Sequence, residues 1–247
     1  MSTKEANLTT AAVIPAAGRG VRLGPGAPKA LRTLGGVPML VHAVRALLRA
    51  RAVTLVVVVA PPDGAVEVRL LLDSHGLPEG KEILVVPGGA TRQDSVRLGL
   101  EALPDDVGTV LVHDAARPLV PVDMVDAVAA AVCEGAPAVV PALPLADTVK
   151  QVEPRDHGPE PVVGTPERAL LRAVQTPQGF RRDVLVSAHL RVPAEGEGAT
   201  DDAGMVERLG TPVVVVPGHE EAFKVTRPLD LVLAEAVLAR RRAADDF

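Results

Sequence analysis

The chain has few aromatic residues: three Phe, no Tyr and no Trp among 247 residues. Proteins that hold single-stranded nucleic acid usually stack its bases on aromatic side chains, and this chain has almost none to offer. Its formal net charge of −5 also argues against the basic face that a nucleic-acid binder needs. We therefore expect no nucleic-acid partner, and a core built from Val, Leu and Ala.

The chain is also poor in cysteine and in long apolar runs. The single cysteine, Cys133, excludes an internal disulfide and a cysteine metal cluster, and we interpret it as a small buried residue in an Ala/Val-rich helix. The apolar run at 55–60 is too short to cross a bilayer, and residues 1–10 lack the apolar segment of a secretory signal. We expect a cytoplasmic protein with no membrane partner.

Short β-branched runs alternate with helical patterns along most of the chain. The runs are nearly all apolar, as in parallel strands buried on both faces, and we expect them at 11–15, 53–60, 82–86, 109–113, 138–142 and 212–216. Apolar residues recur at helical spacing in 39–50, 92–103 and 228–238, the last carrying Leu229, Val232, Leu233, Ala236 and Val237. This alternation predicts an α/β fold with a mostly parallel sheet and helices on both faces.

The alternation stops at about 143–178, where six prolines and two glycines interrupt the chain. So many prolines and glycines, which interrupt helices and strands, predict a segment that leaves the sheet, such as a hairpin arm, rather than a second core. We therefore expect one domain over 1–247.

The first predicted strand leads into a glycine-rich loop that suits a phosphate. Pro15, Ala16, Ala17 and Gly18 are followed by Gly20 and Arg22, and then by Pro28 and Lys29. Glycines let backbone amides approach a phosphate closely, while Arg can clamp it and Lys can neutralise its charge. The prolines at 25 and 28 disagree with a dinucleotide fingerprint, and no Gly-Lys-Ser/Thr forms a P-loop. An ordinary Gly/Pro surface loop remains the alternative.

Asp114 follows a strongly apolar strand, at the end where ligands bind in open α/β sheets. Mg²⁺ favours one or two carboxylates together with phosphate oxygens, so Asp114 is the candidate ligand of Mg²⁺ or another divalent cation. The alternatives are a helix cap or an ion-pair partner for Arg117. His113 beside it is expected to orient or pack rather than to catalyse.

Several ordered motifs resemble one family. They run from the first loop to the last helix: Pro15-Ala-Ala-Gly-x-Gly-x-Arg22 with Pro28-Lys29, Gly88-Gly89-Ala-Thr-Arg-Gln-Asp-Ser95, Val112-His-Asp-Ala-Ala-Arg-Pro118, Asp147-Thr148-Val-Lys, Gln175-Thr-Pro-Gln178, Thr200-Asp-Asp-Ala, and Lys224-Val-Thr-Arg-Pro-Leu-Asp-Leu. Taken together they are similar to the 2-C-methyl-D-erythritol 4-phosphate cytidylyltransferases of the non-mevalonate isoprenoid pathway.

The resemblance implies a Rossmann-like nucleotidyltransferase fold whose protruding β-arm pairs two copies into a homodimer. It implies attack by the acceptor's phosphate on the α-phosphorus of CTP, with release of pyrophosphate. The implied catalytic residues are Arg22, Lys29, Arg168 and Lys224. The implied nucleotide-binding residues are Pro15, Ala16, Ala17, Gly18, Gly20, Gly89, Ser95 and Ala115. The implied contacts to the acceptor are Thr148, Arg168, Lys224 and Arg117, and the implied metal ligand is Asp114.

Two departures stand out: Ala222 where the family often has Asn, and Asp201-Asp202 where Asp-Glu is more frequent. A second metal ligand is open, with Glu220 and Glu221 as candidates. The alternatives for function are a ribitol 5-phosphate cytidylyltransferase, a non-catalytic nucleotide-binding protein on the same fold, and an NAD-dependent oxidoreductase.

Overall fold

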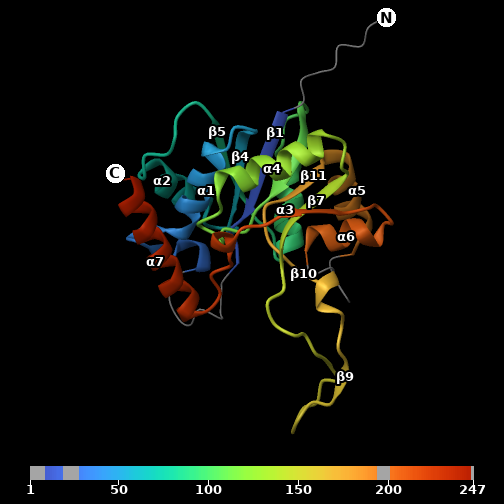
Figure 1. Ribbon diagram of the computed structural model, residues 1–247. Helices are drawn as coiled ribbons and strands as arrows, with labels where there is room; N and C mark the ends of the chain where they lie inside the picture. The colour runs from blue at the N-terminus through green and yellow to red at the C-terminus, as the bar shows by residue number, and fades with distance from the viewer. Residues whose placement is uncertain (1–8, 19–27, 194–200, 246–247) are drawn as a thin grey trace, which may run out of the picture.

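The computed structural model describes residues 9–18, 28–193 and 201–245. These residues form an eight-stranded sheet flanked by helices, with an arm that projects away from it (Figure 1). Gly20 and Arg22 lie outside the described residues. Across these three ranges, the structure has no helix that combines the length and apolar character needed to cross a bilayer.

The sheet is parallel in one half and mixed in the other. Its strand order is β10-β7-β11-β6-β1-β4-β5, with β12 also paired to β7. The parallel half contains β1 (Thr9–Pro15), β4 (Val53–Ala60), β5 (Glu82–Pro87) and β6 (Val107–Val112). The mixed half contains β7 (Ala138–Pro144). It also contains β10 (Arg172–Val174), β11 (Gln178–Arg181) and β12 (Val214–Pro217).

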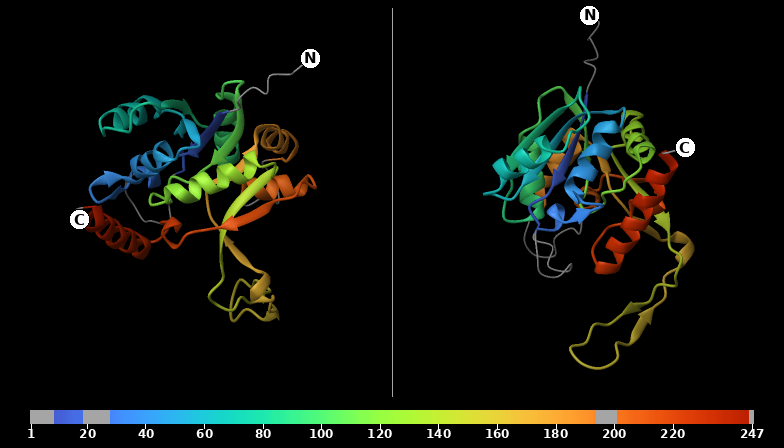
Figure 2. Two further views of the ribbon diagram at one scale, coloured as in Figure 1. Left: turned by 45° about the horizontal axis from the view of Figure 1, so that its top comes forward. Right: turned by 90° about the vertical axis from the view of Figure 1, so that its left-hand side faces the viewer.

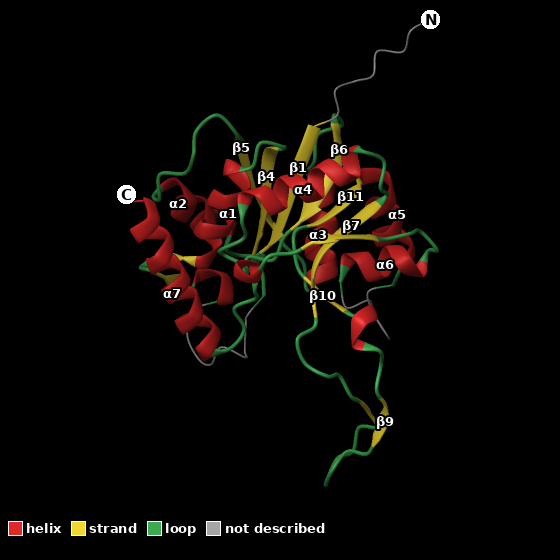
Figure 3. Ribbon diagram, viewed as in Figure 1, coloured by secondary structure: helices red, strands yellow, loops and turns green. Residues whose placement is uncertain are grey.

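Helices cover both faces of the sheet because successive residues of a strand point to opposite sides. Ala12 and Ile14 of β1 face a core with α1 (Met39–Arg49), α2 (Ala65–Asp73) and α4 (Val122–Cys133). Ala11 and Val13 face a second core with α3 (Arg92–Glu101), α5 (Arg182–Arg191) and α6 (Asp202–Arg208). The α/β fold predicted from the sequence is confirmed, and Figure 3 shows the strands between the helices.

All six predicted strands are present, with ends that differ by at most two residues. The strands β10 and β11 were missed because they are three and four residues long. β11 also contains Gly179, where a Cβ would lie 2.6 Å from a methyl carbon of Val128 in α4. The strand therefore depends on a glycine that lets the helix pack closely, which a search for β-branched runs does not detect.

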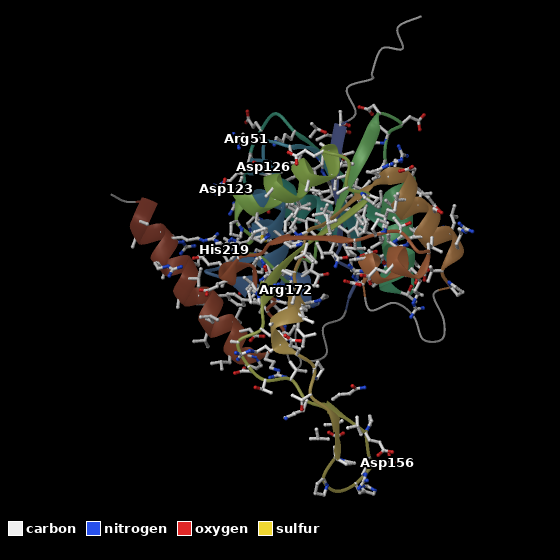
Figure 4. The ribbon with its side chains drawn as sticks, turned by 45° about the vertical axis from the view of Figure 1, so that its right-hand side comes forward. Arg51, Asp123, Asp126, Asp156, Arg172 and His219 are labelled. Carbon is white, nitrogen blue, oxygen red and sulfur yellow. The ribbon has the colours of Figure 1, made fainter. Side chains whose placement is uncertain are left out.

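The arm is shorter than the predicted excursion at 143–178. Leu143 pairs with Ala173 of β10, so both ends of that range belong to the sheet. Beyond the sheet the arm carries a two-stranded ribbon, β8 (Gln151–Val152) with β9 (Val162–Gly164), and a short 3₁₀ helix, η3 (Arg168–Leu170). Figure 2 shows the arm extending from the body, and Figure 4 places Asp156 at its far end.

Two expectations about burial are wrong. Cys133 is exposed at the end of α4 rather than buried in the core. In α7 (Pro228–Asp245), Leu229, Val232 and Leu233 are exposed by 76%, 65% and 52%. The helix instead packs through its other side, with Ala234 buried in a small cluster beside Leu34 and Met39. The helical period was right, but an apolar stripe alone does not tell which face meets the core.

Candidate active site

A cavity opens where β1 and β6 end, at the carboxyl edge of the sheet. It has a volume of about 160 Å³. Ligands bind at this edge in open α/β sheets because the loops that leave the strands converge there. The cavity is lined by Pro15, Ala16, Gly18, Lys29, Ala30, Asp114, Ala115, Ala116 and Lys224. It thus brings together predicted residues that are up to 209 positions apart in the chain (Pro15 to Lys224).

A second cavity of about 180 Å³ shares Pro15, Gly18 and Asp114 with the first. Its other wall is the turn from β5 into α3, where Gly89 and Ser95 both line the space. The Ser95 hydroxyl accepts a hydrogen bond from the Gly89 amide at 3.2 Å and donates to the Thr91 carbonyl at 2.9 Å. The two cavities therefore adjoin each other at Pro15, Gly18 and Asp114.

The three glycines at this site, Gly18, Gly88 and Gly89, differ in whether the surrounding chain leaves room for a side chain. A Cβ on Gly89 would lie 2.4 Å from the Cβ of Asp94, so the turn into α3 excludes any larger residue. A Cβ on Gly88 would lie 2.7 Å from the Ala60 carbonyl oxygen. A Cβ on Gly18, in contrast, would meet no atom of the described residues within 4 Å. Packing among the described residues therefore explains Gly88 and Gly89 but gives no reason for Gly18.

Asp114 is the central charge of the cavity. Its carboxylate lies 2.7 Å from Lys224 Nζ, 3.7 Å from an Arg92 nitrogen and 4.0 Å from Arg117 Nε. Burial alone would raise the pKa of Asp114, but the charges of Arg92, Lys224 and Arg117 outweigh it and lower the pKa to about 2. Asp114 is therefore ionised at neutral pH, as a cation ligand must be.

A buried histidine fixes the backbone at Asp114. The Asp114 amide donates to Thr176 Oγ1 at 3.0 Å, and that hydroxyl lies 3.1 Å from His113 Nδ1. His113 Nε2 lies 3.2 Å from the Arg117 carbonyl, and burial lowers the pKa of His113 to about 4. The neutral ring must donate from Nε2 to a carbonyl, so Nδ1 accepts the Thr176 proton. His113 thus orients the loop from beneath, in agreement with its expected role.

Lys29 and Lys224 reach the cavity from opposite ends of the chain. Lys29 is half-buried at the start of a 3₁₀ turn, η2 (Lys29–Leu31). Lys224 is held beside the β6 loop because the Val225 amide donates to the Ala116 carbonyl at 2.8 Å. The segment after it is anchored by Asp230, whose carboxylate accepts from the Thr226 amide at 2.7 Å. Both lysines therefore line one cavity, and the roles predicted for them from the sequence stay predictions.

Arg117 has a different position from the predicted contact to the acceptor. Its side chain is 11% exposed and donates to the carbonyls of Ala222, at 2.7 Å, and Val174, at 3.3 Å. The two carbonyls belong to the segment before Lys224 and to the end of the arm's return strand. Since its two terminal nitrogens donate to the backbone, Arg117 braces the site, and it is not among the described residues that line the two cavities.

Thr148 and Arg168 lie on the arm rather than at the cavities, and both are exposed. Arg168 donates to the Ala146 carbonyl at 2.6 Å, which joins the two sides of the arm. Neither residue is among the described residues that line the two cavities. Within one copy of the chain, the structure does not bring them together with Lys29 and Asp114.

The residues at the cavity fit a divalent cation held by one carboxylate. Among the described residues, no group of three or more His, Cys, Asp or Glu side chains gathers to enclose a metal. Mg²⁺ is commonly held by one or two carboxylates and by substrate phosphates, so Asp114 alone suits it. The candidate second ligand Glu221 forms ion pairs with Arg240 and Arg241 of α7.

Sequence reasoning missed Arg92 and Asp202 as site residues. Arg92 lines the second cavity and pairs with the fully buried Asp202 at 2.7 Å. Both stand inside motifs that the resemblance used, but an Arg at a helix start and an Asp after another Asp carry no distinctive local pattern. Thr176, which links His113 to Asp114, stood in a third such motif.

A cavity at the carboxyl edge of the sheet, with Lys29 and Lys224 beside Gly18, has the position and the charge of a nucleotide phosphate site, and the family match identifies the class as the nucleotidyltransferases. Residues 10–240 match the family 2-C-methyl-D-erythritol 4-phosphate cytidylyltransferase. The chain belongs to this family and is an enzyme of the nucleotidyltransferase class.

Individual relatives agree with the family match. The chain is 76% identical to the 2-C-methyl-D-erythritol 4-phosphate cytidylyltransferase of Streptomyces coelicolor over 240 residues, which cover 96% of this chain and 88% of the relative. It is 74% identical to that of Streptomyces avermitilis, with 96% and 95% covered. The crystal structure of the Thermus thermophilus enzyme of that name is 37% identical, has a TM-score of 0.70, and is covered to 98% by 94% of this chain.

Proposed function

We propose that this chain transfers CMP from CTP to 2-C-methyl-D-erythritol 4-phosphate at the Asp114 cavity, giving 4-diphosphocytidyl-2-C-methyl-D-erythritol and pyrophosphate. The observation that carries the proposal is the meeting of Lys29, Asp114 and Lys224 in one cavity beside Gly18. The names of the relatives, all 2-C-methyl-D-erythritol 4-phosphate cytidylyltransferases, support the choice of acceptor.

The proposed mechanism relies on positioning and charge. The acceptor's phosphate is already an anion, so its attack on the α-phosphorus needs no general base from the chain. Lys29, together with Arg22, stabilises the charge that develops on the triphosphate as pyrophosphate leaves. Gly89 and Ser95 contact the cytosine, and Gly18 lets the phosphates approach the backbone. A bound Mg²⁺ would supply further charge compensation, with Asp114 as its protein ligand.

Lys224 has a specific part in this mechanism. It lies 2.7 Å from Asp114 and is 40% exposed, so its ammonium faces both the metal ligand and the open cavity. We assign it to the acceptor's phosphate, which it would hold in line with the α-phosphorus. Well-oriented model reactions gain on the order of 7–11 kcal/mol from such positioning.

The acceptor side of the site is completed by a second copy of the chain in this proposal. Thr148 and Arg168 are exposed on the arm, and so are Val162 and Val163 of β9, by 57% and 59%. A homodimer joined through the arms would cover these valines and bring Arg168 to the neighbouring cavity. The cytoplasmic location expected from the sequence stays a prediction.

The dimer can be tested by mixing two impaired variants and assaying them at an acceptor concentration well below the wild-type KM. Lys29→Ala disables the cavity and Arg168→Ala weakens the arm's contact to the acceptor, so a mixed dimer would retain one site with both residues intact. Co-expression with two different tags is expected to recover up to about half of the wild-type turnover per dimer. If the purified mixed dimer is no more active than either parent, the arm does not serve the neighbouring cavity.

The reaction is tested by measuring pyrophosphate release with CTP and Mg²⁺. Parallel assays contain 2-C-methyl-D-erythritol 4-phosphate or ribitol 5-phosphate, and a third contains no acceptor. Release with the first acceptor and not the second is expected. Release with ribitol 5-phosphate instead would reassign the acceptor, and no release with either would contradict the proposed function.

A further inference from the structure

Arg92, the first residue of α3, is shared between two carboxylates. One of its terminal nitrogens lies 2.7 Å from Asp202 and the other 3.7 Å from Asp114. Its side chain is 39% exposed, where it lines the second cavity beside Ser95 and Gly89. The same guanidinium therefore faces the candidate metal ligand on one side and a second carboxylate on the other.

That second carboxylate lies completely inside the protein. Asp202 is 0% exposed, and its other oxygen lies 3.0 Å from Nε2 of His189, whose side chain is 1% exposed. Burial alone would raise the pKa of Asp202, but the charge of Arg92 and the hydrogen bond from His189 outweigh it and hold the pKa below its ordinary value. An ionised and buried carboxylate is costly unless it is paired, so moving Arg92 away from Asp202 would leave the carboxylate without its cationic partner.

The two distances show which carboxylate holds the guanidinium. At 2.7 Å the pair with Asp202 is a direct charged contact, whereas 3.7 Å to Asp114 is beyond a normal hydrogen bond. An Arg92 without Asp202 would have Asp114 as its nearest carboxylate. A direct pair there would compete with a cation for the same oxygens.

We propose that Asp202 is a positioning residue of the active site, which holds Arg92 back from Asp114 and so leaves the Asp114 carboxylate accessible to a divalent cation. The proposal rests on the proposed function, in which Asp114 is the cation's protein ligand. Lys224 and Arg117 also face Asp114, but among the described residues neither forms an ion pair with Asp202, so the effect of Asp202 passes through Arg92. The pair Asp202–His189 acts as a fixed anchor behind the cavity.

A purely structural role for the same contacts makes a different prediction. If Arg92 and Asp202 only join α3 to α6, removing either partner would loosen the site and weaken cation binding in both cases. If Asp202 restrains Arg92, the two removals have opposite effects. Asp202→Asn frees the Arg92 guanidinium to pair with Asp114, which weakens metal binding. Arg92→Gln removes that guanidinium from beside Asp114, which strengthens metal binding.

The experiment measures Mn²⁺ binding by electron paramagnetic resonance, with CTP present and no acceptor, so that no turnover occurs. Asp202→Asn is expected to weaken Mn²⁺ binding by about three- to tenfold, and Arg92→Gln to strengthen it by a similar factor. The matched control is Asp201→Asn. The Asp201 carboxylate caps α6 by accepting from the Gly204 amide at 2.9 Å; its charge also acts on Arg92, but among the described residues the ion pairs of Arg92 are with Asp202 and Asp114. Asn is an equally good cap, so this variant is expected to stay within twofold of the wild type.

Two results would overturn the positioning role while leaving the proposed function in place. One is Asp202→Asn binding Mn²⁺ as tightly as Asp201→Asn, and the other is Arg92→Gln binding it more weakly than the wild type. Arg92 is partly exposed, so Arg92→Gln remains a test even if Asp202→Asn does not fold. A wild-type enzyme that binds no Mn²⁺ with CTP would instead contradict the metal role of Asp114 itself.

Discussion

The carboxyl edge of the sheet and the arm present their charged residues in opposite ways. At the edge, Asp114 is 13% exposed, is flanked by three cations, and has a backbone fixed by Thr176 and buried His113. On the arm, Arg168 is exposed and donates to a carbonyl of the arm itself. Figure 4 shows the separation, with Arg172 where the arm rejoins the body and Asp156 at the far end. The proposed nucleotide site is thus preorganised within one chain, whereas two of the proposed acceptor contacts, Thr148 and Arg168, lie apart from it on the arm.

Of the changes considered, Lys29→Ala should have the largest effect on turnover, because it removes a charge from the preorganised cavity. Removing a positive charge from the developing pyrophosphate is expected to lower kcat by about 10²- to 10³-fold. Lys29 is half-buried in a short turn, so the melting temperature should change little. Lys81→Ala, a lysine beside β5, serves as the matched control. Near-normal kcat in Lys29→Ala would exclude the residue from the triphosphate site.

The pH dependence of stability should reveal the buried support at the same edge. The pKa of His113 is about 4 in the folded chain, against an ordinary value of 6.5. Below pH 6.5 His113 therefore binds a proton in the unfolded chain but stays neutral in the folded chain. Stability that is fully present above pH 6.5 is lost as the pH falls toward 4, in total about 3 kcal/mol from this group.

His113→Gln tests that expectation through the change in the free energy of unfolding with pH, rather than through its value at one pH. The variant is expected to be less stable at pH 7, because Gln does not reproduce both ring contacts, but to lose less stability between pH 6.5 and 4.5. Urea unfolding at several pH values measures the difference. Equal slopes in the two proteins would show that His113 is not the group that resists protonation.

Arg168→Ala should have the smallest effect of the three on the chain itself. Loss of one charged contact is expected to raise the KM for 2-C-methyl-D-erythritol 4-phosphate by about tenfold, with CTP affinity and melting temperature unchanged. Arg155→Ala, an exposed arginine further along the arm, is the control. An equal loss of CTP affinity would mean that the arm also belongs to the nucleotide side, and the contrast between the two regions would disappear.

The same contrast explains what could be predicted from sequence. Local signals were enough for the parallel strands and for two of the cavity residues: β4 is apolar except for Thr54, and Lys29 and Asp114 each stand in a motif that follows a strand. The misses depend on non-local packing. Arg117 was assigned to the acceptor because its motif does not show that its donors are directed at Ala222 and Val174.

Two further misses have related physical causes. The exposed stripe of α7 has the same period as a core-facing helix, and only the packing of Ala234 beside Leu34 decides which side is buried. Arg92 and Asp202 lie 110 positions apart, and their pairing depends on α3 and α6 sharing one face of the sheet.

The position of β11 has a consequence for how the chain is made. The parallel strands β5, β4, β1 and β6 are all contained in residues 9–112, but β11, which covers the outer side of β6, comes at Gln178–Arg181. During synthesis β6 therefore remains an open strand edge while the next 66 residues, from 112 to 178, are added, including the whole arm. Unpaired edges of this kind recruit other strands. A nascent or truncated chain that ends within the arm should therefore aggregate, although every strand of its parallel half is already present.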